Sequence, residues 1–283
     1  MSEFSSKKKI DAADSESVVE KVRERYAVFA STGSSCCGPA PTACCGSSDT
    51  VAENLGYSTV DLDLLPDGAN LGLGCGAPLE HVDLQPGETM LDLGSGAGID
   101  ALIASKKVGS AGLVIGVDMT PEMLESARAN ADRAGVTNVV FREGRLEQLP
   151  VDNDSVDVVT SNCVINLVPD KSAVFAEIAR VLRSGGRLVI SDIVLDGELP
   201  DTVQQNVMAY VGCVAGAERR EKYFETLNTA GLGDVEILKD VDFLQLTEKA
   251  SPAEVVSIME ETGIERKDVE GIVRSVTYRA RKR

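Results

Sequence analysis

Seven cysteines are the residues of this 283-residue chain whose type most directly suggests chemistry. Because the number is odd and the chain is long for a disulfide-stapled scaffold, ligand or redox roles are favoured over structural disulfides. Four of them form two doublets in a Ser-, Gly-, Pro- and Thr-rich stretch, Cys36-Cys37 and Cys44-Cys45. The other three stand alone in distant segments, so they could act together only if the fold gathers them: Cys75, Cys163 and Cys213.

A glycine-rich loop is the second candidate for chemistry, with the sequence Leu91-Asp92-Leu93-Gly94-Ser95-Gly96-Ala97-Gly98. It follows a predicted strand and opens a predicted helix, where glycines let the backbone approach a ligand closely. Asp118 closes the next predicted strand, 20 residues after Gly98, where a carboxylate can accept hydrogen bonds from both ribose hydroxyls. A dinucleotide site is the competing interpretation, but Ile99 occupies the last glycine position of its G-x-G-x-x-G pattern.

The elements that must position these residues alternate between strand and helix from residue 89 onward. Apolar runs predict strands, and helical spacing predicts the helices between them; the strands are 89–93, 112–117, 138–143, 155–161 and 186–192, and the helices are 99–107, 121–134 and 171–182. This alternation predicts an α/β fold with a doubly wound, mostly parallel sheet covered on both faces. Ligands of such folds bind beyond the carboxyl ends of the strands, and Cys163 follows the fourth strand. By position alone it could equally be a small buried core residue.

The flanking regions suggest three parts. Residues 1–50 are expected to hold an amphipathic helix at 14–30 and the Cys-rich segment, and residues 51–195 the nucleotide-binding domain. Residues 196–283 are expected to form a substrate-binding insertion and to complete the sheet, with helices at 223–230 and 252–270 and strands at 235–241 and 275–281. The connection 193–220 is longer than the fold requires, and it carries Cys213.

The composition of the chain disfavours several classes of binding partner. The net charge is 28 − 45 = −17, which disfavours nucleic acid and anionic membranes as partners. We expect no membrane span and no secretory signal, and therefore a cytoplasmic location where thiols stay reduced. With one histidine, His81, and no tryptophan, the chain offers little to a hydrolytic His/Cys metal site. The oligomeric state has no signature in the sequence.

Six segments resemble those of arsenite S-adenosylmethionine methyltransferases, over a region from about residue 20 to residue 235: SSCCG, GLGCGAP, LDLGSGAGID, SNCVINLVPDK, SGGRLVISDIV and VGCVAGA. The resemblance implies a class I methyltransferase fold, S-adenosylmethionine as cofactor, and arsenite or methylarsenite as the acceptor. It implies that Cys163 and Cys213 are the principal arsenic ligands and that Cys75 is the third. It also implies a disulfide partner for Cys75 in the N-terminal segment, which is one of Cys36, Cys37, Cys44 and Cys45.

The same resemblance implies a set of cofactor-binding residues: Tyr57, Asp92, Gly94, Ser95, Gly96, Gly98, Asp118, Met119, Leu146, Glu147 and Asn162. Asp92 is implied to lie near the cofactor's ammonium group, and the loop amides near its carboxylate. Arg145 departs from the family pattern, because many class I enzymes have an acidic residue there. We therefore expect the adenine to be contacted by the Leu146 backbone or by Glu147.

Thiol ligands suit this acceptor because trivalent arsenic is soft. Three thiolates leave its lone pair free to attack a methyl group in line, so alignment, and no general base, carries the reaction. Surplus cysteines could return the arsenic to the trivalent state by forming a disulfide, which thioredoxin or glutathione would then reduce.

Two alternatives remain open at this stage. One is a methyltransferase for a small organic acceptor, in which the cysteines are structural. The other is a metalloid-binding or metalloid-sensing protein without catalysis; the intact glycine loop and Asp118 count against it.

Overall fold

The computed structural model describes residues 15–32, 48–204, 213–250, 259–260 and 262–283. Its centre is a seven-stranded sheet in the order β3-β2-β1-β4-β5-β7-β6. Neighbouring pairs from β3 to β5 are parallel, whereas β7 runs antiparallel to both β5 and β6. The expected doubly wound α/β fold is confirmed. The strands are β1 (Thr89–Leu93), β2 (Leu113–Asp118), β3 (Val139–Glu143), β4 (Val156–Asn162), β5 (Leu182–Leu195), β6 (Leu232–Asp242) and β7 (Val273–Lys282).

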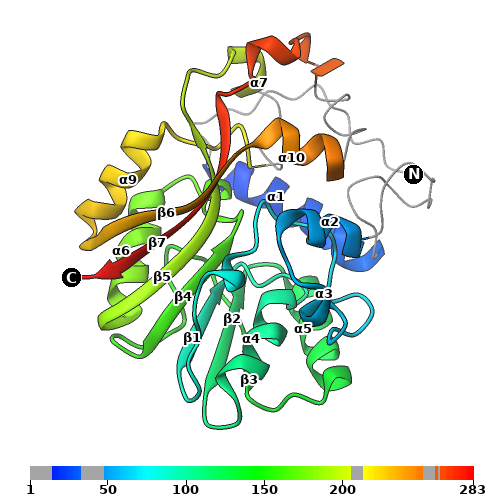
Figure 1. Ribbon diagram of the computed structural model, residues 1–283, viewed down its shortest axis with the longest axis vertical. Helices are drawn as coiled ribbons and strands as arrows, with labels where there is room; N and C mark the ends of the chain where they lie inside the picture. The colour runs from blue at the N-terminus through cyan, green and yellow to red at the C-terminus, as the bar shows by residue number, and fades with distance from the viewer. Residues whose placement is uncertain (1–14, 33–47, 205–212, 251–258, 261) are drawn as a thin grey trace.

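Helices connect and cover these strands, and Figure 1 shows them on both sides of the sheet. The longer ones are α1 (Ser15–Thr32), α2 (Ser48–Leu55), α4 (Ile99–Val108), α5 (Pro121–Ala134), α6 (Lys171–Val181), α9 (Arg220–Thr229) and α10 (Phe243–Ala250). The short ones are α3 (Thr59–Leu62), α7 (Asp201–Gln204), and the 3-10 turns η1 (Pro78–Glu80), η2 (Ile165–Leu167) and η3 (Arg266–Asp268). None of the helices in the described residues is long and apolar enough to cross a membrane.

The expected helix over 252–270 is wrong beyond residue 262. Residues 259, 260 and 262 are helical, but Gly263 then adopts a φ of +69°, and only η3 follows before β7. A left-handed glycine ends a helix because it lets the chain turn without a Cβ clash. Residues 251–258 lie outside the described part.

Alternating side chains along β1 explain why both faces of the sheet are covered. Leu91 and Leu93 lie in the apolar cluster that also holds Phe175 of α6 and Leu227 of α9. Met90 points to the opposite cluster, with residues of α4 and α2. All three β1 side chains are fully buried, and burying such a side chain is worth about 1.5–3 kcal/mol. This packing fixes the carboxyl end of β1, and with it the glycine loop.

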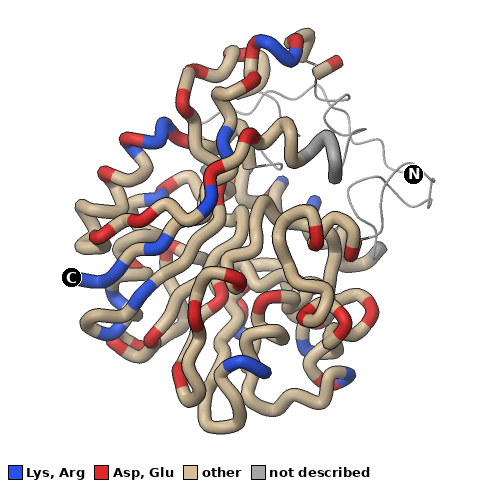
Figure 2. The backbone as a smooth tube through the Cα atoms, in the orientation of Figure 1, with Lys and Arg blue, Asp and Glu red and all other residues tan. Residues whose placement is uncertain are grey.

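Charge is distributed unevenly along the strands at the edge (Figure 2). Basic residues are frequent in β7, and several of them pair with acidic residues. Arg279 lies 2.5 Å from Glu236 of β6, and Arg274 lies 2.8 Å from Asp240. These pairs help to align the antiparallel edge of the sheet with β6.

Candidate active site

The three single cysteines converge, although they come from three distant segments. Cys75 lies in the loop before η1, Cys163 directly follows β4, and Cys213 lies between α7 and α9. Their residues are 1%, 9% and 2% exposed, respectively. The Cys213 thiol donates a hydrogen bond to the Cys163 carbonyl oxygen, with a distance of 2.6 Å. We call these three residues the thiol cluster.

The three thiols interact with one another, and these interactions shift the pKa values of Cys163 and Cys75. Hydrogen bonds with the Cys213 and Cys75 thiols, together with burial, raise the pKa of Cys163 well above its usual value. Burial also raises the pKa of Cys75, although a hydrogen bond with Cys163 acts in the opposite direction. Without a ligand, Cys75 and Cys163 are therefore neutral thiols at pH 7.

The backbone at two of these cysteines is strained. Cys163 has a φ of 60° and Cys213 a φ of 64°, which is the left-handed region that favours glycine. Strain of this kind persists where the surrounding structure imposes it, and it clusters at functional sites. At Cys163 the amide donates to the Ser191 carbonyl oxygen, at 2.8 Å, which extends the β4–β5 ladder by one residue. The sheet thus fixes the thiol at the end of β4.

Asn162 fixes Cys75 beside Cys163. Its side-chain oxygen accepts hydrogen bonds from the Cys75 and Gly76 amides, at 3.1 and 3.3 Å. Its amide nitrogen donates to the Gly76 carbonyl oxygen at 2.7 Å and to the Tyr57 hydroxyl at 3.0 Å. The Tyr57 hydroxyl in turn donates to Asp100 at 2.8 Å. The family resemblance implied only a cofactor-binding role for Asn162. In the structure its side chain also holds the loop that carries Cys75.

A pocket adjoins the thiol cluster at the carboxyl ends of the strands, and we call it the cofactor pocket. Cys163 and Cys213 line it, whereas Cys75 is buried behind them and is not part of the lining. Nine of the residues expected to bind the cofactor also line it: Asp92, Gly94, Ser95, Gly96, Asp118, Met119, Leu146, Glu147 and Asn162. Tyr57 is outside the lining but bonded to two lining residues, and Gly98 caps α4 with a φ of 97°.

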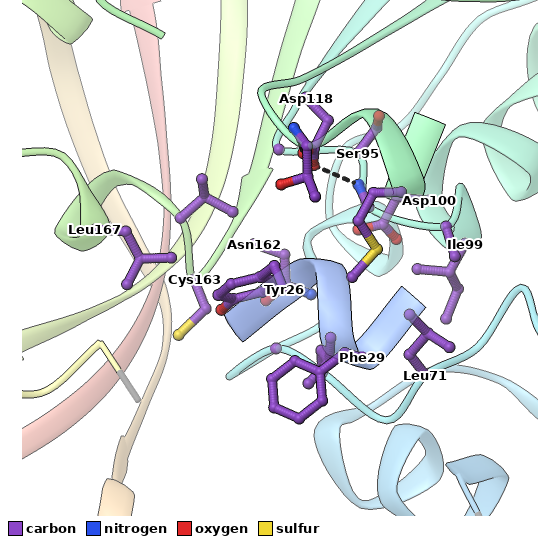
Figure 3. Close-up of a pocket in the computed structure, with 18 of the residues that line it drawn as sticks. Tyr26, Phe29, Leu71, Ser95, Ile99, Asp100, Asp118, Asn162, Cys163 and Leu167 are labelled. Atoms are coloured by element: carbon purple, nitrogen blue, oxygen red, sulfur yellow. Dashed lines mark hydrogen bonds between the residues drawn. The ribbon is translucent and has the colours of Figure 1, made fainter. Parts of the chain in front are cut away.

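The glycine loop is shaped for a close backbone approach. Gly94 and Gly96 have φ values of +67° and +51°. The Gly96 amide donates to Asp118 at 2.9 Å, as the dashed line in Figure 3 marks, and the Thr120 amide donates to the same carboxylate at 2.8 Å. The hydroxyl of Ser95 is buried without a hydrogen-bond partner among the described residues, which is costly unless a ligand supplies one.

Two buried carboxylates, Asp92 and Asp100, and the partly buried Asp118 give this pocket a preference for cations. Burial raises the pKa of Asp92 well above its usual value, raises that of Asp118, and raises that of Asp100 to about 6. A positively charged ligand would favour the ionised forms of these groups. The preference fits S-adenosylmethionine, which carries an ammonium group and a sulfonium.

Helix α1 supplies pocket residues that the sequence analysis missed. Tyr26 and Phe29 project from α1 into the pocket, with their rings edge to face and their centroids 5.8 Å apart (Figure 3). Their spacing with Val22 on one face of the predicted helix was the available signal. Arg145, which departs from the family pattern, bonds to Glu16 of α1 at 2.9 Å and to Glu147 at 3.0 Å.

Asp192 is a second residue that the sequence analysis did not single out. One of its carboxylate oxygens and the sulfurs of Cys75 and Cys163 all lie within 4.8 Å of one another. It stands near the end of β5, next to Ser191, in one of the quoted segments. The expected redox cysteines lie outside the described residues: Cys36, Cys37, Cys44 and Cys45.

Comparisons with known proteins show to which family the chain belongs. Residues 84–258 match a family model described as a methyltransferase domain. The chain is 48% identical to the arsenite methyltransferase of Halobacterium salinarum over 79% of its own length and 59% of that protein, and 41% identical to the human arsenite methyltransferase over 51% and 40%. The chain thus spans about three fifths or less of the length of these curated relatives.

One solved structure matches this chain over a larger share of its own length than these relatives do. The crystal structure of CrArsM, an arsenic(III) S-adenosylmethionine methyltransferase from Chlamydomonas reinhardtii, superposes with a TM-score of 0.60 at 32% identity. The match covers 82% of this chain and 73% of that one. The chain therefore belongs to the arsenite S-adenosylmethionine methyltransferase family.

Proposed function

We propose that this protein transfers the methyl group of S-adenosylmethionine to trivalent arsenic bound by Cys75, Cys163 and Cys213. The observation that carries the proposal is the meeting of three thiols from distant segments, two of which, Cys163 and Cys213, line the cofactor pocket. A methyltransferase for an organic acceptor would have no use for a thiol at each of these positions. It would have still less reason to keep two of them in a strained backbone conformation.

The cofactor would be held by residues of the glycine loop and its neighbours. Asp92 would face the ammonium group, Asp118 the ribose hydroxyls, and Leu146 with Glu147 the adenine. The orphaned Ser95 hydroxyl would gain a partner. Bound S-adenosylmethionine supplies an electrophilic methyl group on a positively charged sulfur. The chain's part is to bring the acceptor atom into line with that methyl group, at about 3–3.5 Å.

Arsenite would bind by exchanging its three hydroxyls for three sulfurs. Each thiol proton leaves with one hydroxyl as water, so thiols of raised pKa need no separate base. The arsenic keeps its lone pair, which forms the bond to the methyl carbon. The electrons of the broken carbon–sulfur bond remain on the cofactor's sulfur, and the arsenic is formally oxidised from the trivalent to the pentavalent state.

Redox steps complete the proposed cycle. A thiolate of the N-terminal segment, from Cys36, Cys37, Cys44 or Cys45, attacks the arsenic-bound sulfur of Cys75. A disulfide forms, and the electron pair of the arsenic–sulfur bond returns the arsenic to the trivalent state. An external thiol system, thioredoxin or glutathione, then reduces the disulfide. This requires a reducing compartment, such as the cytoplasm.

The test is incubation of the full chain with arsenite or methylarsenite, labelled S-adenosylmethionine and a thiol reductant, followed by chromatographic speciation of arsenic. We expect labelled methylarsenicals from the wild type, and a loss of at least about 1000-fold in methylation by Cys163→Ser, which cannot align the acceptor. Cofactor binding by this variant, measured by equilibrium dialysis, should be unchanged. An unmethylated arsenic pool with the wild type contradicts the proposal.

Cys75→Ser separates the redox proposal from the methyl transfer. If Cys75 forms the disulfide, this variant should be unable to turn over repeatedly even with excess reductant. Unchanged methylation of both arsenite and methylarsenite by Cys75→Ser would show that the disulfide step is wrong while leaving methyl transfer intact.

A further inference from the structure

The thiol cluster contains a carboxylate that trivalent arsenic does not require. Asp192 is fully buried, and one of its oxygens lies within 4.8 Å of the sulfurs of both Cys75 and Cys163. Arsenic bound to three thiolates is complete as a pyramidal centre, because its fourth direction holds the lone pair. Three thiolates also neutralise its charge, so a fourth anion adds neither a bond nor a needed charge.

Asp192 is held rigidly toward the cluster by three donors. One carboxylate oxygen accepts from the Ile193 amide at 3.0 Å and from the Asn166 side chain at 2.9 Å. The other accepts from the Tyr223 hydroxyl at 3.0 Å. These bonds fix the orientation of the carboxylate and leave lone pairs for one further partner. Such support for a ligand from its neighbours is typical of metal sites.

One buried positive charge, the Lys171 ammonium, acts on the Asp192 carboxylate. Lys171 makes its hydrogen bond to the Gly216 carbonyl oxygen, at 2.9 Å, and not to Asp192. The carboxylate thus keeps a lone pair for a cation placed among the thiols, and such a cation would stabilise both the carboxylate and the thiolates.

The donor set matches one class of cation. Soft divalent ions with filled d shells, such as zinc and cadmium, bind thiolate and carboxylate ligands and favour four-coordinate, tetrahedral sites when closed from solvent. In a tetrahedral site, metal–sulfur bonds of about 2.3 Å and metal–oxygen bonds of about 2.0–2.2 Å put neighbouring ligand atoms roughly 3.5–3.8 Å apart. The ligand atoms of Cys75, Cys163 and Asp192 all lie within 4.8 Å of one another, so at most a small contraction would bring them onto one ion. Cys213 lies outside that group of ligand atoms, but its thiol interacts with Cys163, and it would supply the third sulfur.

We propose that Cys75, Cys163, Cys213 and Asp192 form a closed four-ligand site for a soft divalent cation of the zinc–cadmium class. Such a cation would occupy the position of trivalent arsenic and exclude it. Asp192 distinguishes the divalent cation from trivalent arsenic, because its carboxylate would coordinate the cation but would form no bond to arsenic. The cation site goes beyond the proposed methyl transfer and does not depend on it.

The experiment is a cadmium titration of the reduced, full-length protein, followed by the sulfur-to-cadmium charge-transfer absorbance. All proteins compared carry serine at positions 36, 37, 44 and 45, so that the N-terminal thiols do not contribute. Asp192→Asn keeps the shape of the side chain but is a far poorer ligand, and should weaken cadmium binding by about 100-fold. Its arsenite affinity, measured by equilibrium dialysis, should stay within about twofold of the parent, because no arsenic bond is lost.

Asp242→Asn is the matched control, because Asp242 is also buried and accepts from two backbone amides, those of Leu244 and Gly271, but does not face the thiols. It should bind cadmium like the parent. A cadmium-113 NMR shift of the parent protein, which distinguishes three sulfurs plus one oxygen from sulfur alone, keeps the proposal testable if Asp192→Asn does not fold. Equal cadmium affinity for Asp192→Asn and the parent, an all-sulfur shift, or simultaneous binding of cadmium and arsenite would each overturn the proposal.

Discussion

Both sides of the pocket contain residues with a left-handed backbone conformation, but the residue types differ. On the cofactor side, the left-handed positions are glycines, as at Gly94 and Gly96, where that conformation costs little. On the thiol side, they are Cys163 and Cys213, where a non-glycine residue costs on the order of 1–3 kcal/mol each. The chain accepts strain where a side chain is needed and avoids it where the backbone itself is the binding surface.

The contrast extends to charge. The cofactor side has three carboxylates, the buried Asp92 and Asp100 and the partly buried Asp118, which suit a cationic ligand. On the thiol side the proposed acceptor is neutral, the pKa values of the Cys75 and Cys163 thiols are raised, and the carboxylate that lies with their sulfurs is Asp192. The two sides should therefore respond differently to mutation and to pH.

Gly94→Ala should have the largest effect, because it disturbs both sides at once. A Cβ there would lie 2.6 Å or less from both Cγ atoms of Val164, the residue after Cys163. With the cost of a positive φ, we expect a loss of about 2–5 kcal/mol in the free energy of unfolding, measured in urea. Affinities for both the cofactor and arsenite should fall.

Gly135→Ala is the control for that experiment. Gly135 has nearly the same φ, +63°, but a Cβ there would meet nothing within 4 Å. It should lose only the conformational part, about 1–2 kcal/mol, with both affinities retained. If the two variants are equally stable, then the contact with Val164 does not join the two sides.

A pH titration should separate the sides by their charge, with an effect of about tenfold between pH 5 and pH 7 on cofactor affinity. Asp100 has a raised pKa of about 6, so it is protonated below that pH in the free protein. A cationic ligand favours the ionised carboxylate, and affinity should rise as the pH rises through 6. The sign for folding is the opposite: the raised pKa means that the stability of the unliganded protein falls across the same rise in pH.

Arsenite affinity should stay flat over that range. Exchange of three hydroxyls for three thiols releases water and no net proton, and the Cys75 and Cys163 thiols have raised pKa values. Equilibrium dialysis of both ligands measures the contrast. Asp100→Asn should flatten the cofactor curve, whereas Asp196→Asn, at an exposed carboxylate paired with Arg220, should not. Parallel curves for the two ligands would remove the electrostatic distinction.

Sequence and structure agree where the determinants are local. The glycine loop lies between the end of β1 and the start of α4, and Asp118 is the last residue of β2. The pattern of residues 89–118 therefore predicts both strands, the helix between them and the glycine loop. The family resemblance named Cys75, Cys163 and Cys213, but no spacing in the sequence could show that their sulfurs meet, because their convergence depends on three loops packing at one end of the sheet.

Asp192 was missed for the same reason, because its neighbour Cys75 is more than 80 residues away in the sequence. Asn162 was expected to bind the cofactor, but its hydrogen bond with the equally distant Cys75 amide could not be predicted. The helix predicted over 252–270 does not continue past residue 262, because Gly263 adopts a left-handed conformation that ends the turn. The division into three domains remains a prediction, as does the identity of the N-terminal redox cysteine.

Lys171→Met should have the smallest effect, and it should be confined to the thiol side. The buried Lys171 ammonium donates to the Gly216 carbonyl oxygen at 2.9 Å, which ties the turn carrying Cys213 to the segment that follows Cys163. A charge-assisted hydrogen bond is worth about 1.5–3 kcal/mol, but burying the ammonium group offsets part of it, so arsenite affinity should fall only about fivefold. Lys222→Met removes an exposed ammonium group paired with Glu218 in the same region and should leave arsenite affinity unchanged. Cofactor affinity, measured in parallel, should be the same in both variants; a loss of cofactor binding in Lys171→Met would mean that the Cys213 turn also supports the cofactor side.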